Sequence, residues 1–301
     1  MAPGTVSPPA PPGNVARPPE REPAADQIAP VPRRRPPSRA APGRLRARAS
    51  AVLPPLLLGA AVLLLWQIAR WTDAAPTLLL PAPADVLRSF GLLLTVPALR
   101  GYIAGTVIAS LGGCALGAFV ALPLGYAIAR SPLLARAVQP YLAASQALPA
   151  VALAPLIALW LGYGVAPRMG LCALIVFFPM VVTTVLGLRG LDREVLDAAR
   201  VEGAGRWSLL WRIELPLALP SILAGLRTSL TLSITGAVVG EFVLGGGSGL
   251  FDQGLGQLLG QFLNENDSAG VFATLLALAL LAALYYGLAR LAERRFSFLE
   301  V

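Results

Sequence analysis

The chain alternates between long runs without charged residues and short polar segments. Uncharged runs cover residues 49–69, 101–129, 137–167, 169–188 and 268–289, and a further run over 215–240 is interrupted only by Arg227. About 20 apolar residues cross a bilayer as a helix, so each of these runs predicts one span. The runs lack the period-2 alternation of a membrane β-strand. The pattern therefore predicts an all-α membrane protein with six transmembrane helices.

Composition supports this prediction and excludes several kinds of function. The chain is 56% apolar and only 13% charged, whereas a soluble domain carries about 25% charged residues. It contains no histidine, which excludes a histidine-based metal site and a Ser-His-Asp triad. We therefore predict no catalytic residues, no metal ligands and no cofactor. Cys114 and Cys172 fall inside apolar runs, where we expect small buried hydrophobic residues rather than a disulfide.

The net charge of +8 is concentrated at the N-terminus. Residues 1–50 hold nine arginines and three acidic residues, so the charge does not predict a nucleic-acid partner. Residues 1–48 are rich in proline and arginine with few large apolar residues, a composition that cannot repay the entropy of ordering. We expect a disordered tail over 1–48, followed by a membrane domain over 49–301 whose first helix is an uncleaved span.

Arginine placement predicts the orientation of the spans. With a cytoplasmic N-terminus, the inner segments hold the arginines of the tail and ten others, and the outer segments hold only Arg70, Arg88, Arg100 and Arg168. The last outer segment, residues 241–267, has four acidic residues and no arginine. The positive-inside rule therefore predicts that both termini and residues 189–214 are cytoplasmic.

Residues 189–214 form a polar island between apolar runs, with ten of 26 residues charged. As a helix, its first part places Leu191, Val195, Ala198 and Ala199 on one face, with the ion pairs Arg193–Asp197 and Glu202–Arg206 four residues apart. Gly203-Ala204-Gly205 interrupts this helix, and a second short helix follows with Trp207, Leu210 and Trp211 on one side. Local chemistry alone fits either an amphipathic loop on the membrane surface or a docking element for another protein.

A resemblance favours docking. Asp197-Ala198-Ala199, three residues, Gly203, nine residues and Ile213-x-Leu215-Pro216 closely resemble the EAA motif of ABC importer permeases, Glu-Ala-Ala-x3-Gly-x9-Ile-x-Leu-Pro. Every spacing matches, and Asp197 replaces the family's glutamate with a side chain one methylene shorter. The resemblance implies a type I (methionine-importer-like) permease fold and a coupling loop over 189–214 that docks into an ATPase subunit.

The similarity covers most of residues 78–295. The segments LLLPAPADVL (78–87), ALPAVALAPLIALWLGYG (147–164) and GEFVLGGGSGL (240–250) resemble the nitrate, sulfonate and taurine branch of these permeases, and the pyrimidine-precursor permeases of thiamine synthesis share much of the pattern. The resemblance implies a bacterial inner-membrane subunit that meets ATPase subunits, a solute-binding protein and a second permease copy. The substrate it implies is a sulfonate, taurine or nitrate-like anion, or alternatively a thiamine pyrimidine precursor or related heterocycle.

Two charged residues of the fifth run are candidates for the translocation pathway. Arg227 lies about 16 Å of helix rise past Pro216, where it either packs against neighbouring helices or attracts an anionic substrate. Glu241 ends the run and is either an interfacial residue or a contact at the outer gate. A stand-alone secondary transporter is the alternative of another class, but it needs ionisable residues within the spans, and only Arg227 qualifies. The glycine run 245–249 lacks the Lys-Ser/Thr of a phosphate loop and predicts a flexible turn.

Overall fold

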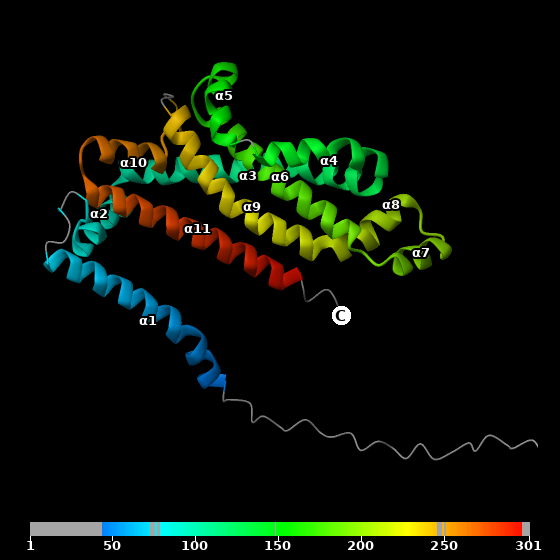
Figure 1. The fold of residues 1–301 in the computed structure, drawn as a ribbon, viewed down its shortest axis with the longest axis horizontal. Helices are drawn as coiled ribbons and strands as arrows, with labels where there is room; N and C mark the ends of the chain where they lie inside the picture. The colour runs from blue at the N-terminus through cyan, green and yellow to red at the C-terminus, as the bar shows by residue number, and fades with distance from the viewer. Residues whose placement is uncertain are drawn as a thin grey trace, which may run out of the picture. The chain divides into compact units, whose positions relative to one another are not determined.

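The computed structural model describes residues 44–296, apart from 73–75, 77–78, 148, 246–248 and 250, and these residues form helices and connecting turns (Figure 1). The elements are α1 Arg44–Trp71, α2 Pro83–Thr95, α3 Pro97–Arg130, α4 Pro132–Ala147, a 3-10 helix Ala150–Leu153, α5 Ala154–Leu161, α6 Val165–Arg189, α7 Arg193–Val201, α8 Arg206–Leu209, a π-helical turn Leu210–Glu214, α9 Leu215–Leu244, α10 Leu255–Asn264 and α11 Ser268–Phe296. The all-α prediction is confirmed.

The chain divides into two units at residues 57 and 58. Most of the predicted tail lies outside the described residues, as does most of the glycine run 245–249. Within the described part of the first unit, α1 begins at Arg44, ahead of the expected boundary at 49. The second unit contains the bundle and all of the candidate site residues.

Of the six expected spans, four or five are found among the described residues. By length and composition, four described helices are able to cross a membrane: Pro97–Arg130, Val165–Arg189, Arg206–Leu244 and Ser268–Arg295. A bent pair, Pro132–Ser145 and Ala150–Leu161, provides a fifth if it is counted as one span. In the first predicted span, the apolar helix over described residues is the shorter stretch Leu56–Trp71.

The run 137–167, expected to form one span, is bent in the structure. The two parts of the pair meet at 89°, and Pro149 has extended backbone angles of φ −64° and ψ 111° just before the 3-10 helix. A proline lacks the backbone N–H that would continue the helix and disfavours helical geometry in the preceding residue. Gly162 and Gly164, with φ of 77° and 121°, then reverse the chain between α5 and α6.

The centre of the bundle is built on α6, which packs between α3 and α9. A Cβ added to Gly113 or Gly117 of α3 would meet α6 backbone atoms, and one added to Gly225 of α9 would meet Thr183 of α6. Small residues thus let the three helices approach closely, as expected for packing within a membrane. Cys114 and Cys172 are free and buried between these helices, which confirms the prediction of buried hydrophobic residues.

Two groups of short helices lie at opposite ends of this bundle. Figure 1 shows α7 and α8 at one end, here called the α7 end, and α2 and α10 at the other, here called the α10 end. A second hydrophobic cluster joins α2, α10 and α11 through Val86, Leu93, Leu258 and Leu281. The long apolar helices connect the two ends.

Candidate functional site

Helix α7 carries the first part of the EAA-like motif. Asp192 caps its N-terminus by accepting a hydrogen bond from the Glu194 N–H at 2.9 Å. Leu196 and Ala199 are buried against Leu209, with Leu191, Ala204 and Ile213 around them. Asp197 and Ala198 are exposed. The helix therefore rests on the following segment and presents the start of the motif outward.

The predicted apolar face of α7 is partly wrong. Ala199 and Leu191 do pack inward, but Val195 is 46% exposed and Ala198 is also exposed. Helix α7 begins only at Arg193, so its packing contact is the residue pair Leu196 and Ala199. The sequence does contain a signal for this contact. Leu196 is a larger apolar residue than Val195, and it lies at the i, i+3 spacing that places it beside Ala199 on a helix.

The charge pairing of α7 also differs from the prediction. Asp197 pairs with Arg200 at 2.5 Å instead of with Arg193. The predicted pair Glu202–Arg206 spans the gap between two helices, because α7 ends at Val201 and α8 begins at Arg206. Residues four apart face each other only within one helix, so this spacing does not predict a contact across the break.

Gly203 shapes the turn that follows α7. Its φ is 89°, a left-handed conformation that side chains with a Cβ adopt at a cost. Its N–H donates to the Arg200 carbonyl at 3.0 Å, and the Ala204 N–H donates to the Ala199 carbonyl at 3.0 Å. The glycine of the motif therefore closes α7 and turns the chain towards α8.

The expectation of a separate second short helix is wrong. Residues Arg206–Leu244 form one helix, in which α8 passes through the π-helical turn Leu210–Glu214 directly into α9. Pro216 lies where the π-helical turn passes into α9, and the helix continues past it without a break. Trp207 and Trp211 are 74% and 61% exposed, whereas Leu209 rather than Leu210 is buried.

An ion pair with a buried carboxylate lies beside this turn, and the sequence analysis does not predict it. Glu214, 1% exposed, pairs with Arg130 at the end of α3. Arg130 also lies over the Tyr126 ring, 5.8 Å from its centroid. The sequence signal is Glu214 itself, a charge directly between the apolar motif residues Ile213 and Leu215.

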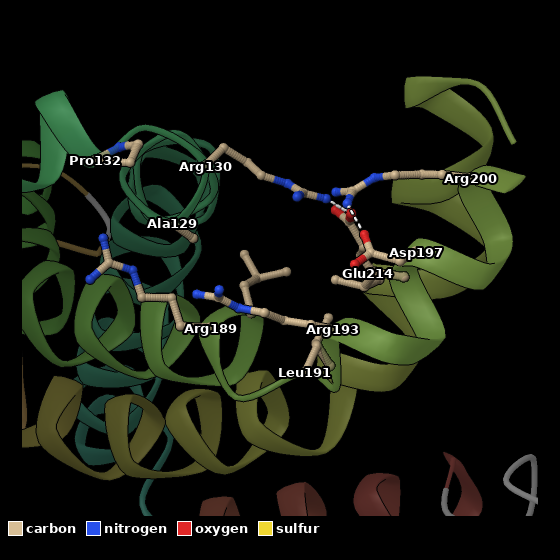
Figure 2. A pocket seen from close by; sticks show the side chains of 11 residues that line it. Ala129, Arg130, Pro132, Arg189, Leu191, Arg193, Asp197, Arg200 and Glu214 are labelled. Atoms are coloured by element: carbon tan, nitrogen blue, oxygen red, sulfur yellow. Dashed lines mark hydrogen bonds and ion pairs between the residues drawn. The ribbon is translucent and has the colours of Figure 1, made fainter. Parts of the chain in front are cut away.

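A cavity of about 610 Å³ opens between α7 and the ends of α3 and α6. Its charged lining is shown in Figure 2: Arg130, Arg189, Arg193, Asp197, Arg200 and Glu214. Arg189 donates to the Ile128 carbonyl at 3.1 Å. The motif helix is thus separated from the bundle by a polar space rather than packed flush against it.

Glu241 belongs to a buried network at the α10 end. Its carboxylate accepts hydrogen bonds from the Thr106 hydroxyl at 2.7 Å and from the Gly256 N–H at 2.6 Å. The Thr106 oxygen accepts from the Leu255 N–H at 2.8 Å. Two side chains from α3 and α9 therefore cap the N-terminus of α10, and Glu241 is 1% exposed rather than interfacial.

Arg168, which the sequence places in an outer segment between two spans, belongs to a helix. It is fully buried in the first turn of α6. Its Nε donates to the Gly164 carbonyl at 2.9 Å, and its Nη2 lies 3.5 Å from Asp252 Oδ1. Asp252 also accepts from the Val165 N–H at 3.0 Å. The pair ties the start of α6 to the loop before α10.

Arg227 joins α9 to α11. Its Nη1 lies 2.9 Å from Glu293 Oε2, and its guanidinium lies 5.3 Å from the centroid of the Tyr286 ring. The helix-packing alternative fits these contacts, because both polar partners come from the neighbouring helix. The pathway alternative stays a prediction.

A family model for the inner membrane component of binding-protein-dependent transport systems matches residues 113–298. The chain belongs to this family. The match contains α6, α7, α9 and α11, with the EAA-like motif at its centre. The chain is thus a permease subunit of an ABC importer, a multi-pass inner-membrane protein and not an enzyme. Membership implies ATPase and solute-binding partners.

Curated relatives cover most of the permease. It is 41% identical over 233 residues to the riboflavin transport system permease protein RibX of Chloroflexus aurantiacus, covering 77% of this chain and 85% of RibX. It is 32% identical to the formylaminopyrimidine transport permease protein ThiX of Halalkalibacterium halodurans, covering 79% and 92%. The putative aliphatic sulfonates transport permease protein SsuC of Bacillus subtilis is 30% identical, covering 80% and 85%.

A solved structure confirms the type I importer fold. The inward-facing MetNI methionine ABC transporter matches with a TM-score of 0.58 at 18% identity, covering 66% of this chain and 95% of the matched chain. At this identity the likeness concerns the fold. It agrees with the methionine-importer-like fold implied by the EAA-like motif.

Proposed function

We propose that α7 is the coupling helix by which this permease meets its ATPase subunit. The observation that supports this is the geometry of the motif: Leu196 and Ala199 hold α7 to the helix after it, while Asp197 and Ala198 point away from that contact. Ala198 is small, so a cleft on the partner is able to close tightly around it. The partner then moves α7 when ATP binding brings two ATPase subunits together.

Assembly and orientation are part of the same proposal. Two permease copies form the pathway, the α7 end faces the cytoplasm, and the α10 end faces the solute-binding protein. Both termini are cytoplasmic. Exposed apolar side chains on and after α5, at Leu159, Trp160, Leu161 and Tyr163, are 61–77% exposed in the single chain, and a second copy is a suitable cover for them.

For the substrate, we favour a neutral or weakly charged aromatic heterocycle of the riboflavin or pyrimidine type. The relatives named for such compounds have the higher identities, 41% and 32%. Within the described spans, Arg168 and Arg227 are each paired with a carboxylate. Neither residue therefore offers an anion a free positive charge, and desolvating the anion would be costly.

A sulfonate, taurine or nitrate-like anion is the second candidate. The 30% identity to SsuC supports it. Sulfonates, taurine and nitrate carry a fully ionised anionic group that the heterocycles lack, so a pathway that suits one class is poorly suited to the other.

One reconstitution tests the proposal. The permease, its neighbouring ATPase and its binding protein are co-expressed, and uptake of riboflavin, a formylaminopyrimidine, taurine and nitrate is measured in proteoliposomes. We expect ATP-dependent uptake of a heterocycle and loss of ATPase co-purification with Ala198→Trp, while the exposed Trp207→Ala variant retains it. Uptake of taurine or nitrate alone would establish the second candidate, and normal co-purification of Ala198→Trp would refute α7 docking.

A further inference from the structure

Glu214 is unusual among the acidic side chains of this permease. In the described part of the chain, the buried acidic side chains are Glu214 at the α7 end and Glu241 at the α10 end, each 1% exposed. Burying a carboxylate is costly unless it is paired. Glu241 has hydrogen-bond donors from two other elements, whereas the ion-pair partner of Glu214 is the single residue Arg130.

The π-helical turn brings Glu214 to this partner. Leu209 and Ile213, before and within the turn, pack with Leu196 and Ala199 of α7. Glu214 is the last residue of the turn and contacts the end of α3 instead. Turns of this kind insert an extra residue into a helix and are frequent at functional sites. One short segment therefore contacts α7 on one side and α3 on the other.

Two ion pairs lie in sequence across this end of the molecule. Figure 2 shows the guanidinium groups of Arg130 and Arg200 reaching towards each other, with Glu214 at the first and Asp197 at the second. Arg130 and Arg200 also line a second cavity together with Arg206. The chain connects α7 directly to α6. Between α7 and α3, the charged side chains of these two ion pairs span the space.

We propose that Arg130 and Glu214 are positioning residues that transmit the movement of α7 to the membrane helices. The proposal rests on the proposed docking of α7 to an ATPase. When α7 moves, its packing contacts move residues 206–213, and Glu214 carries this displacement through Arg130 to α3. Helix α3 packs along α6 through Gly113 and Gly117, so the displacement reaches the centre of the bundle.

The test uses the reconstituted importer with ATPase and binding protein. Four variants are compared: Glu214→Gln, Arg130→Gln, the charge exchange Arg130→Glu with Glu214→Arg, and the control Arg212→Gln. Arg212 is exposed in the same turn. Three quantities are measured: co-purification with the ATPase, the ATPase rate with loaded binding protein, and substrate transported per ATP hydrolysed.

We expect both single variants to assemble with the ATPase and hydrolyse ATP, but to transport about tenfold less substrate per ATP, within the usual range of coupling between two sites. The charge exchange restores transport per ATP to within about threefold, because the two residues act as a unit. Arg212→Gln behaves as the unmodified permease. A merely structural role would lower protein yield without changing this ratio.

Several results would overturn the proposal: wild-type transport per ATP in either single variant, no recovery in the charge exchange, or a loss of ATPase co-purification in the single variants. If Glu214→Gln fails to fold, the variants Glu214→Asp and Arg130→Lys are used instead, because each keeps both charges but shortens one side chain of the pair. An unchanged amount of substrate transported per ATP in both variants then refutes the transmission role. If Ala198→Trp also leaves docking intact, the proposed function itself fails. If docking is lost there but the pair variants are normal, only the transmission role fails.

Discussion

The Thr106 hydroxyl in α3 donates a hydrogen bond of 2.7 Å to the Glu241 carboxylate in α9, and both side chains are buried. The same two side chains accept the first N–H groups of α10, from Leu255 and Gly256. Helix α10 has no side-chain cap from its own N-cap residue, Gly254. Three helices therefore meet through one non-local cap, which explains why a carboxylate is retained inside an apolar bundle.

Removing this cap is expected to destabilise the permease. Glu241→Ala leaves the Gly256 N–H without its partner, at a cost of about 1–3 kcal/mol for an unsatisfied group, and leaves the Thr106 hydroxyl with only the Tyr102 carbonyl, at 3.3 Å. We expect a lower Tm in detergent, together with faster amide exchange in α10. Thr106→Val should lower the Tm in the same direction, while Thr106→Ser, which keeps the hydroxyl, should not. An unchanged Tm for Glu241→Ala would contradict the capping role.

Gly254 is predicted to tolerate no side chain. A Cβ at this position would collide with the Glu241 carboxylate, and moving the carboxylate away would strain its hydrogen bonds to Thr106 and Gly256. We expect Gly254→Ala to lower the Tm and to disturb α10. Gly260→Ala is the matched control on the same helix, since its Cβ would lie at an ordinary 3.5 Å from Phe242. Equal Tm values for the two variants would show that the carboxylate is free to shift.

The pair Arg227–Glu293 is expected to stabilise the contact between α9 and α11. Because both side chains retain some exposure, 30% and 22%, each single change to glutamine should cost about 1 kcal/mol. The double variant should cost less than the two changes added together. Thermal unfolding and uptake are measured on all three proteins. Reduced uptake in Arg227→Gln alone, with normal stability, would instead favour a role of Arg227 in the pathway.

Gly203 is expected to be essential for the shape of the coupling loop. Its φ of 89° costs a residue with a Cβ about 1–2 kcal/mol, and more for a branched one. With Gly203→Val, we expect the ATPase subunits to hydrolyse ATP while less substrate is transported per ATP. Gly205→Val is the control, because Gly205 has a φ of −67° and open space around it. Transport per ATP measured on both variants decides the point: a normal ratio for Gly203→Val excludes the coupling role of this turn.

Asp197→Glu should be tolerated. The exposed side chain at 197 pairs locally with Arg200, and exposed pairs contribute little to stability. We expect ATPase affinity and transport to stay within about threefold of the parent, because about 0.6 kcal/mol is the scale of such differences. Asp197→Ala serves as the comparison. A large loss of affinity in Asp197→Glu would mean that the partner's cleft is fitted to the shorter side chain.

The long apolar helices are the best predicted part of the fold, because few soluble structures leave 20 or more consecutive residues without a charge. Helices α3, α6, α9 and α11 each contain one predicted run. Prediction is poorer where backbone geometry decides: the proline-rich run 137–167 bends between Ser145 and Ala150, and the π-helical turn joins α8 to α9 without a break. Neither a bend nor a π-helical turn changes the hydropathy of the residues, so the pattern of apolar and charged positions predicts neither.

Residue partners are the least predictable part of the site. Charge normally indicates contact with water, yet Arg168, Glu214 and Glu241 are all buried. Each is compensated by a residue far along the chain, and sequence spacing gives no information on such pairs. The EAA-like spacing locates the segment proposed for coupling, but not which of its residues pack inward.

The unbroken helix Arg206–Leu244 has a mechanical consequence. At the rise of an α-helix its 39 residues extend about 58 Å, more than the thickness of a bilayer. One end is held by α7, and the other holds the cap of α10. If α7 docks to an ATPase as proposed, a tilt imposed at the first end would reach the cap of α10 through this one helix, so the two faces of the membrane would be connected without a second moving element.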